Sequence, residues 1–545
     1  AGRTTPAAAP LRFVEPVVSD LNGPNPVLAP DGSFIVYQTD TLRLRRFDEL
    51  ETREIPGTTG AGNPFVSPDA RWIGFYADGK LKKVGVEGRE PVTITEVSSD
   101  SPGAAFISND RILFSPGWYR SVLQSVSADG GPVSPASTLD EAAGERGHWW
   151  PHALPGGRYV LFTVWYASTG LSASKIAVLD LESGTHRVLF PGAMPQFANG
   201  HLLFYRSGQY HAAPFDPSTH TLTAEPSAVL PDALGLDPAG DNNVTVSLAA
   251  NGMVAYWPGE LYPLMQFSWV DRKGHVTPTP IRSEVEGADL SPDDRQVIVG
   301  RPQAGLSRIW LFDLSGGERA LDGDGANWGP HWHPDGRRII YTTIRKGEYD
   351  VAIQSIDGPQ EFVLASDNDE GAVSWTPDGR MIVKEWIANG PSSIQLHDPV
   401  SKARVNLVSG DFEKWEAEVS PDGRWLAFCA DPNGVFALYV RPIAERGTIQ
   451  RLAPAGSYCT ARWSRASKEL AFIRGDNLVT LAYAERGDRL EPLQETVVAT
   501  LARGTELYGI SNDGNRFLVG IPPAENVPVT GIRIIADGIA AIQRR

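Results

Sequence analysis

The chain has 545 residues, with 49 Lys and Arg against 65 Asp and Glu, so its formal net charge is −16. This length exceeds the roughly 250 to 300 residues at which a single hydrophobic core stops growing, and it predicts more than one domain. The negative charge opposes nonspecific attraction to nucleic acid and anionic lipid, so neither is expected as a partner. The sequence contains no apolar run of bilayer-spanning length and no signal-peptide pattern at its start. The chain is expected to be soluble, with any membrane connection through an upstream segment.

Residues 1–10, AGRTTPAAAP, have the composition of a Pro/Ala linker. Beyond them one short phrase recurs, and its best copy is SPDGRWLAF at Ser420–Phe428. Its Pro-Asp-Gly predicts a tight turn, because Pro presets φ, Asp hydrogen-bonds the following backbone and Gly tolerates a positive φ. The apolar run after the turn predicts a buried strand.

The phrase occurs twelve times, strictly or in weaker form. In chain order the turns fall at Asp31, Asp69, Asp110, Gly156, Gly200, Gly252, Asp293, Asp335, Asp378, Asp422, Ala466 and Asp513. Their spacing of about 40 residues holds four short strands, which is one propeller blade. Since four to eight blades close a ring, the sequence predicts an all-β fold of two tandem six-bladed β-propellers with four-stranded antiparallel blades, at residues 11–260 and 261–545. Arg12–Val14 and Gly531–Ile535 are candidates for strands that close a ring and remove open sheet edges.

Two local features are less informative. The cysteines, Cys429 and Cys459, lie in neighbouring repeats, where either a disulfide or two free thiols would fit. The acidic runs DGDG at Asp322 and DNDEG at Asp367 contain oxygen ligands suited to Ca²⁺ but lack the EF-hand spacing. They are predicted to be solvated loops.

Several longer phrases resemble a known family. They are IPGTTGAGNPFVSPDARWIGFYADGKLKKV at Ile55–Val84, GHWWPHALPGGRYVLFT at Gly147–Thr163, AAPFD at Ala212–Asp216 and FSWVDRKG at Phe267–Gly274. Together with the SPDG repeats they resemble the TolB-like propeller region that lies C-terminal to the kinase domain and membrane span of many bacterial serine/threonine kinases. The resemblance covers nearly the whole chain. It implies a bacterial, extracytoplasmic sensor or interaction module, periplasmic or at the cell surface.

The sequence carries no motif for kinase or hydrolase chemistry. It lacks the kinase Gly-rich loop, V-A-I-K, H-R-D and D-F-G motifs, and it lacks the G-x-S-x-G nucleophile elbow. We therefore predict a non-catalytic module without a cofactor, which binds a protein, peptide or carbohydrate. Two alternatives stay open: a secreted propeller enzyme, either a polysaccharide lyase or a glycoside hydrolase, and an envelope scaffold.

Candidate ligand-binding residues follow from the repeat. If the strand before each turn is innermost, the residue two positions before the Ser-like residue lines the channel. In the second ring these positions are Asp289, His331, Ser374, Glu418, Arg462 and Gly509, with Tyr508 beside the last, and in the first ring they are Val27, Phe65, Phe106, His152, Gln196 and Ser247. The second set could bind a charged ligand, and in an enzyme Asp289 and Glu418 would form a carboxylate pair with His331 and Arg462 beside them. The competing interpretation is a wet channel lined by polar groups.

Other candidates have both a functional and a structural interpretation. His331 and His333 have the i, i+2 spacing of a metal pair, although His333 occupies the turn-capping position. His148, Trp150 and His152 could stack on or hydrogen-bond a ligand, or belong to the core. The tryptophans that recur just before the Ser-like position are expected to pack between blades, namely Trp332, Trp375 and Trp463.

Overall fold

The computed structural model describes residues 12–17, 25–97, 102–117, 120–166, 173–233, 245–258, 262, 264–303, 306–321, 326–345, 348–364, 369–387, 392–410, 412, 414–430, 437–444, 447–453, 460–523 and 531–539. The predicted linker at 1–10 and the DGDG run at Asp322 lie outside them. The chain divides into two compact units. The first comprises Ala1–Tyr166, Gly170–Leu261 and Pro528–Arg545, and the second comprises Tyr262–Val527 with Ala167–Thr169.

The repeated phrase forms the predicted turn. The Ser420 hydroxyl donates to Asp422 at 2.5 Å and accepts the Trp425 N–H at 2.9 Å, while the Gly423 N–H donates to the Ser420 carbonyl. Gly423 has a φ of 73°, which is why glycine is favoured at this position. The turn joins strands β39 (Lys414–Val419) and β40 (Trp425–Ala430) into an antiparallel pair.

In the first unit the described residues form six antiparallel sheets and one short 3₁₀ helix, η1 (Glu141–Ala143). The sheets, each in spatial order, are β2 (Val27–Leu28), β3 (Phe34–Gln38), β4 (Leu42–Arg46) and β5 (Thr52–Glu54); β6 (Gly62–Val66), β7 (Trp72–Ala77), β8 (Lys80–Gly85) and β9 (Val92–Glu96); β10 (Ala104–Ser108), β11 (Arg111–Phe114), β12 (Gln124–Ser127) and β13 (Ser134–Pro135); β14 (Gly147–Ala153), β15 (Tyr159–Trp165), β16 (Lys175–Asp180) and β17 (Thr185–Pro191); β18 (Ala193–Ala198), β19 (His201–Arg206) and β20 (Gln209–Asp216), with β21 (Thr221–Leu222) and β22 (Ser227–Val229) both on β20; and β23 (Val246–Leu248), β24 (Val254–Tyr256), β49 (Gly531–Ile535) and β1 (Arg12–Pro16).

In the second unit the described residues also form six sheets, each of four antiparallel strands. In spatial order they are β27 (Ala288–Leu290), β28 (Gln296–Gln303), β29 (Leu306–Asp313) and β30 (Glu318–Ala320); β31 (Asn327–Trp332), β32 (Arg338–Arg345), β33 (Glu348–Ser355) and β34 (Gln360–Leu364); β35 (Asp369–Trp375), β36 (Met381–Trp386), β37 (Ser393–His397) and β38 (Arg404–Val408); β39, β40, β41 (Ala437–Pro442) and β42 (Gln450–Arg451); β43 (Arg462–Trp463), β44 (Glu469–Arg474), β45 (Asn477–Arg486) and β46 (Arg489–Thr500); and β47 (Glu506–Ile510), β48 (Arg516–Ile521), β25 (Met265–Asp271) and β26 (Val276–Ser283).

The first strand of each sheet contacts the first strand of the next sheet around a closed ring. In the first unit the ring runs β2, β6, β10, β14, β18, β23 and back to β2, and in the second it runs β27, β31, β35, β39, β43, β47 and back to β27. These strands are therefore innermost, as predicted for the strand before each turn. Sheets arranged radially around a channel define the β-propeller, so the predicted fold class is confirmed.

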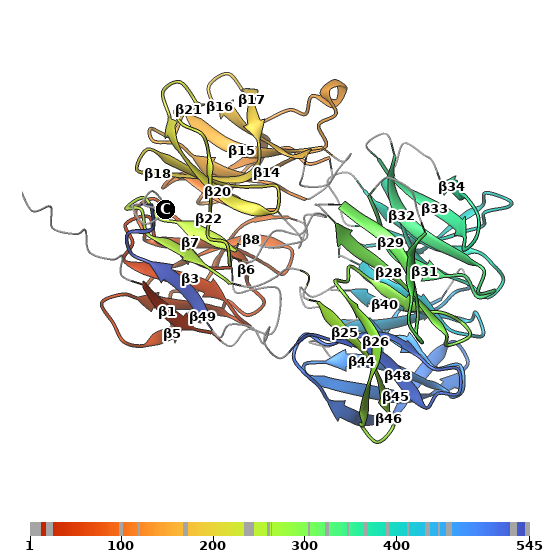
Figure 1. The fold of residues 1–545 in the computed structure, drawn as a ribbon. Coiled ribbons are helices and arrows are strands. Elements are labelled where there is room, and N and C mark those ends of the chain that lie inside the picture. Colours follow the sequence, from red (N-terminus) through yellow and green to blue (C-terminus); the bar gives the residue numbers. More distant parts are fainter. Residues whose placement is uncertain are drawn as a thin grey trace, which may run out of the picture. The chain divides into compact units, whose positions relative to one another are not determined.

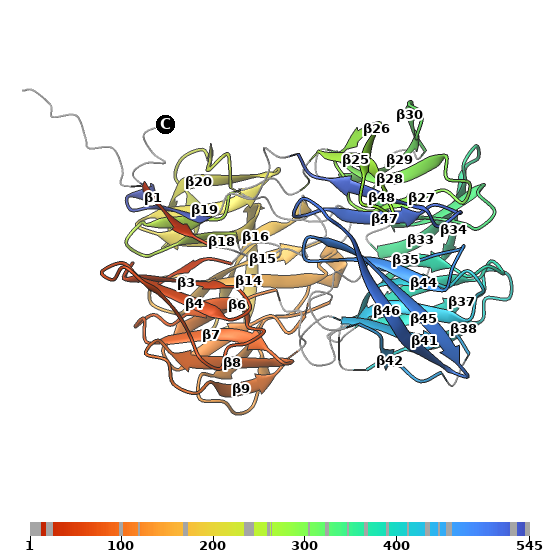
Figure 2. The ribbon, with the colours of Figure 1, turned by 90° about the horizontal axis from the view of Figure 1, so that it is seen from below.

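The closing sheets join segments that are far apart in the sequence. In the first unit, β49 from the C-terminal end lies between β24 and β1, and Figure 1 shows this blue strand beside the red one. In the second unit, β25 and β26 complete the sheet begun by β47 and β48, as the adjacent green and blue strands in Figure 2 show. The chain thus enters the second unit after β24 and returns to supply β49. Gly531–Ile535 belongs to the first unit rather than to the range 261–545 expected for the second.

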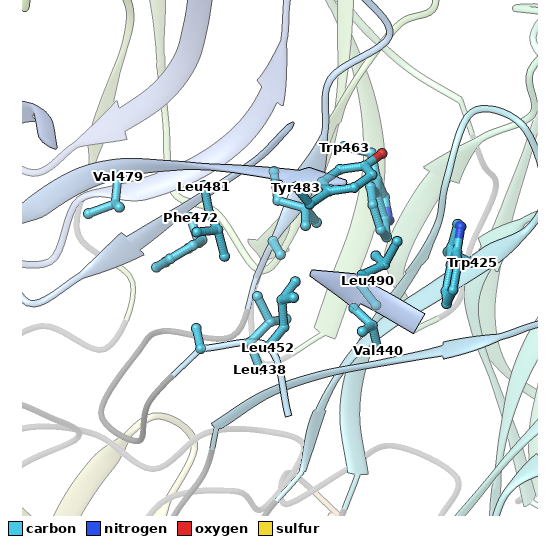
Figure 3. Close-up of a cluster of buried hydrophobic side chains, with 14 residues drawn as sticks. Trp425, Leu438, Val440, Leu452, Trp463, Phe472, Val479, Leu481, Tyr483 and Leu490 are labelled. Carbon is cyan, nitrogen blue, oxygen red and sulfur yellow. The ribbon is translucent and has the colours of Figure 1, made fainter. Parts of the chain in front are cut away.

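The hydrophobic core lies between neighbouring sheets. One cluster joins Trp425 and Leu438 of one sheet to Trp463, Phe472 and other residues of the next sheet in the second unit (Figure 3). Each sheet therefore buries apolar side chains against its neighbour, which explains the apolar run that follows each predicted turn.

Two local predictions are settled in part. Cys429, buried in β40, is disulfide-bonded, and Cys459 lies outside the described residues. The predicted solvated loop at Asp367 is wrong for Asp369–Gly371, which begin β35, because Asp369 and Glu370 are fully buried and Glu370 pairs with Arg404. In the described part of the chain, no helix has the length and apolar character needed to span a membrane.

Candidate functional site

The inner strands of the first unit enclose a cavity of about 680 Å³. All six positions predicted for the first channel line it: Val27, Phe65, Phe106, His152, Gln196 and Ser247. The lining also includes Trp150 and parts of the turns that follow the inner strands, such as Pro30 and Pro155. The residues two positions before the Ser-like residue in each repeat therefore lie around one cavity, as predicted.

The cavity lining is mostly apolar and carries no charged side chain of the described residues. Among the described residues, no Asp, Glu, Lys or Arg contributes to it, whereas Phe65, Phe106, Trp150 and six prolines do. Its polar groups are amides, a hydroxyl and an imidazole. Asn25 is 1% exposed, its amide donates to Gln38 at 2.7 Å, and its Oδ1 has no hydrogen-bond partner among the described residues. This oxygen is buried, so it is not open to a ligand in the cavity.

Four inner strands of the first unit share a strained pattern that the sequence analysis missed. A residue with left-handed φ precedes a proline, and the proline precedes the channel residue. The left-handed residues are Asn25 (φ 43°), Asn63 (φ 47°), Trp150 (φ 48°) and Met194 (φ 52°). β-Bulges at this point in β6, β14 and β18 shift the register and re-aim the channel side chain. For bulky Trp150 and Met194 this conformation costs roughly 1 to 3 kcal/mol each, a strain that is commonly found at functional sites.

Polar channel side chains have a structural task that recurs from blade to blade. Each accepts the backbone N–H that follows the channel position in the next sheet. In the first unit the pairs are His152 Nε2 with Phe197 N–H (3.0 Å), Gln196 Oε1 with Leu248 N–H (2.7 Å) and Ser247 Oγ with Leu28 N–H (3.0 Å). Burial lowers the pKa of His152 to about 4, so its imidazole is neutral at pH 7 and able to accept.

In the second unit carboxylates make the same hydrogen bond from a channel side chain to the next sheet, which we call the inter-blade clamp. Asp289 accepts the Trp332 N–H at 2.8 Å, and the Trp332 indole donates back to the Asp289 carbonyl at 3.1 Å. Glu418 and Trp463 make the same two contacts, at 3.3 and 3.0 Å. Trp375 packs edge-on against His333 of the preceding sheet, with ring centroids 4.5 Å apart. The predicted inter-blade role of the three tryptophans is confirmed.

Arg462 is the centre of the charged cluster in the second channel. Its guanidinium lies 3.3 Å from Glu418 and 3.4 Å from the Ala288 carbonyl across the ring. Burial raises the pKa of Glu418 to about 7, against the opposing effect of Arg462, and burial also raises the pKa of Asp289. The Glu418 side chain is nevertheless 26% exposed, as expected for a group facing a channel. Burial, with Arg462 nearby, lowers the pKa of His331 to about 3.

The structure thus brings Asp289, His331, Glu418 and Arg462 within electrostatic reach of one another. The other second-ring candidates differ. Tyr508 is buried, stacks on Phe267 and donates to Glu506, whose pKa burial raises to about 7. A side chain at Gly509 would collide with Leu290, and Ser374 is 8% exposed.

This cluster is poorly suited to the catalytic alternative. A carboxyl group with a pKa near 7 could transfer protons. However, one Glu418 oxygen accepts the Trp463 N–H and the other faces Arg462, so both are used in inter-blade contacts. Asp289 is likewise held by Trp332.

Cations lie beside both members of the weak metal pair. His333 accepts the Asp335 N–H through Nδ1, so it hydrogen-bonds within its own turn, and the Arg338 guanidinium lies 3.1 Å from its Nε2. His331 is near Arg462. The positive charge disfavours a metal ion at this pair.

The remaining candidates, all in β14, point to two different places. Trp150 and His152 line the cavity, but His148 points elsewhere, into a buried cluster with Glu145 and His186. The sequence analysis missed Glu145 and His186, because nothing in the repeat pattern links residues 38 to 41 positions apart on a loop and an outer strand.

The fold and the channel define a β-propeller that works as a binding or interaction module. Residues 329–497 match the family model described as the TolB beta propeller domain. The chain thus carries a TolB-like β-propeller. No curated protein compared with the sequence matches it.

Several solved structures align with this chain at low identity. A TolB structure from Agrobacterium tumefaciens aligns with 18% identity over 48% of this chain and 99% of its own, with a TM-score of 0.37. TolB from Acinetobacter baumannii aligns with 16% identity over 61% of this chain and 79% of its own, with a TM-score of 0.30. The tricorn protease aligns with 12% identity over 93% of this chain and 61% of its own, with a TM-score of 0.31.

Proposed function

We propose that this chain is a non-catalytic binding module whose first-unit channel holds an uncharged peptide segment of a partner protein. The observation that carries the proposal is the cavity of about 680 Å³, lined by all six inner strands and by no charged side chain of the described residues. Ligand sites usually enclose about 300 to 1,000 Å³ and combine apolar walls with a few placed polar groups.

The lining chemistry favours a peptide. Prolines and the rings of Phe65, Phe106 and Trp150 offer apolar contact for side chains. The polar side chains of the lining are neutral amides, a hydroxyl and an imidazole, and neutral donors and acceptors suit the uncharged backbone of a peptide. A charged ligand would lose its hydration here without gaining an ion pair, which disfavours uronic acids and phosphorylated segments.

In its wider context we propose that the module is the extracytoplasmic sensor region of a bacterial membrane serine/threonine kinase. Two observations support this context: the resemblance of the phrases at Ile55–Val84 and Gly147–Thr163, and the disulfide at Cys429. Disulfides persist mainly in oxidising compartments outside the cytoplasm. The complete reading frame is expected to encode a kinase domain and one membrane span before this chain. A frame with neither would contradict the kinase context.

Binding is tested with a ligand panel on the whole chain. Blocked neutral peptides, the same peptides with Glu or Lys introduced, and neutral and uronic oligosaccharides are compared by thermal shift and calorimetry. We expect neutral peptides to stabilise the protein, by roughly 2.7 kcal/mol at a hundredfold excess over Kd.

The position of the ligand is tested by photo-crosslinking. A bound neutral peptide with a photoreactive group is expected to label inner strands of the first unit, near Phe65 and Phe106. Labelling confined to the second unit, or a clear preference for charged ligands, would contradict the proposal. Binding of neutral oligosaccharides in the same channel would replace the peptide as ligand class.

A further inference from the structure

Three potential metal ligands converge at the interface between two sheets of the first unit, away from the channel cavity. Glu145 lies just before β14, His148 is at the start of that strand, and His186 is in β17 at the outer edge of the same sheet. Glu145 is 1% exposed and His148 is fully buried, while 13% of the His186 side chain is exposed.

The ligand atoms are close and face one another. His148 Nε2 lies 3.2 Å from one Glu145 oxygen, and His186 Nε2 lies 3.0 Å from the other. One atom from each of the three residues can be chosen so that all lie within 4.8 Å of one another. Ligands about 2.0 to 2.1 Å from a tetrahedral Zn²⁺ are roughly 3.3 Å apart, so small side-chain movements would place an ion between them.

The surrounding structure fixes these side chains. Ser137 Oγ lies 2.8 Å from His148 Nδ1, which leaves Nε2 directed at Glu145. The Asp140 N–H donates to Glu145 at 2.7 Å, and Phe162 packs against both imidazole rings. A hydrogen bond to the second imidazole nitrogen and to the ligating carboxylate is the arrangement that orients metal ligands in proteins.

We propose that Glu145, His148 and His186 bind one divalent transition-metal ion, with Zn²⁺ the best match. Two imidazoles and a carboxylate suit Zn²⁺ and leave one position for water. With a metal at Nε2, the His148 proton sits on Nδ1 and is donated to Ser137 Oγ.

The bound ion would act as a structural staple. It would tie the loop before β14 to the outer strand β17 of the same sheet. β14 also supplies Trp150 and His152 to the channel cavity, so the ion would hold that strand in place. The site does not depend on the proposed peptide ligand and goes beyond it.

The experiment uses the full chain, stripped with a chelator and titrated with ZnCl₂ against a competing indicator dye. We expect one high-affinity Zn²⁺ per chain and an increase in Tm that the chelator reverses. With CoCl₂, we expect the visible absorption of a tetrahedral Co²⁺ site. Wild type without stoichiometric Zn²⁺ would overturn the proposal and leave a purely hydrogen-bonded cluster.

Variants locate the ion. Glu145→Gln and His186→Gln are expected to weaken Zn²⁺ binding by more than tenfold, and Ser137→Ala by about 10- to 100-fold. His201→Gln, an imidazole elsewhere in the same unit, and His331→Gln in the second unit should bind as wild type does. Wild-type Zn²⁺ affinity in both Glu145→Gln and His186→Gln, or loss of Zn²⁺ binding in either control, would overturn the assignment. Circular dichroism in chelator separates lost binding from lost folding.

Discussion

The two propellers use the same repeat to build channels of opposite character. In the first unit the channel positions are half apolar and half neutral polar, and they line a cavity without charged side chains among the described residues. In the second unit the same positions hold Asp289, Glu418 and Arg462, which are engaged with one another and with the neighbouring sheets. The comparison shows that a polar residue at a channel position is no evidence of a binding site by itself.

The reason is geometric. At five places in the two rings, the backbone N–H after a channel position donates to the channel side chain of the preceding sheet. The accepting side chains are those of His152, Gln196, Ser247, Asp289 and Glu418. A carboxylate in this place requires a counter-charge, which Arg462 provides. An amide, hydroxyl or neutral imidazole requires none, and this leaves the first channel free of charge.

The largest expected effect comes from removing β49, the strand that closes the first ring but not the second. Truncation after Val527 removes β49, whose Ile532 and Ile534 are fully buried between β24 and β1. We expect the first unit to lose its cooperative unfolding transition, while the second unit keeps a closing sheet made of its own strands. Calorimetry and limited proteolysis would show this. A truncated chain with both transitions intact would contradict the observed strand order.

Removing the counter-charge of the second channel should be nearly as severe. Arg462→Leu leaves Glu418 without its ion-pair partner and removes the stronger of the two positive charges that act on Asp289, and breaking a buried pair typically costs about 3 to 5 kcal/mol. Urea unfolding at neutral pH measures the loss in the second unit. The exposed Arg337→Leu serves as control, and equal losses in both variants would show that the cluster is unimportant.

Because Glu418 titrates, the difference in stability between wild type and Glu418→Gln should depend on pH. Because burial raises the folded-state pKa of Glu418 to about 7, above its ordinary value of 4.5, its contribution to stability is present below pH 4.5 and is lost as the pH rises through 7. The free energy of unfolding of Glu418→Gln, relative to that of wild type, should therefore rise as the pH increases from 4.5 to 7, by up to about 3 kcal/mol. Unfolding curves across this range test the shift. A constant difference between the two proteins would contradict it, and Glu506→Gln should behave similarly.

A clamp in the uncharged channel should have a smaller effect. Gln196→Ala removes the donor to the Val246 carbonyl and the acceptor of the Leu248 N–H, both at 2.7 Å. We expect a loss of about 1 to 3 kcal/mol in the first unit, mainly from the unsatisfied buried backbone groups. Gln209→Ala, at an exposed position of β20, is the matched control. If both variants unfold alike, the clamp does not stabilise the ring.

Much of the fold was predictable from the sequence, because the turn phrase is local and repeats. The same regularity located the first channel, since Phe65, Phe106 and His152 were found by counting back from the turn. The clamps were not predictable, because their hydrogen bonds join residues about one repeat apart, for example Glu418 and Trp463. Gly531–Ile535 was correctly expected to close a ring, but it was placed in the second ring, because nothing local in this segment distinguishes a strand of the first ring from one of the second.

The most direct test of the account blocks one channel at a time and measures the affinity for a neutral blocked peptide. Val27→Trp narrows the first channel at a position with no side-chain hydrogen bond, whereas Glu418→Gln changes the second channel and keeps its clamp oxygen. Val14→Trp, at an exposed position of β1, controls for the added indole. Because Val27 is partly buried beside a core cluster, we expect Val27→Trp to stay folded with a loss of about 1 to 3 kcal/mol, and to bind the peptide at least tenfold more weakly. The other two variants should bind the peptide with wild-type affinity. Undiminished binding in Val27→Trp, or loss of binding in Glu418→Gln, would contradict the assignment of ligand binding to the first propeller.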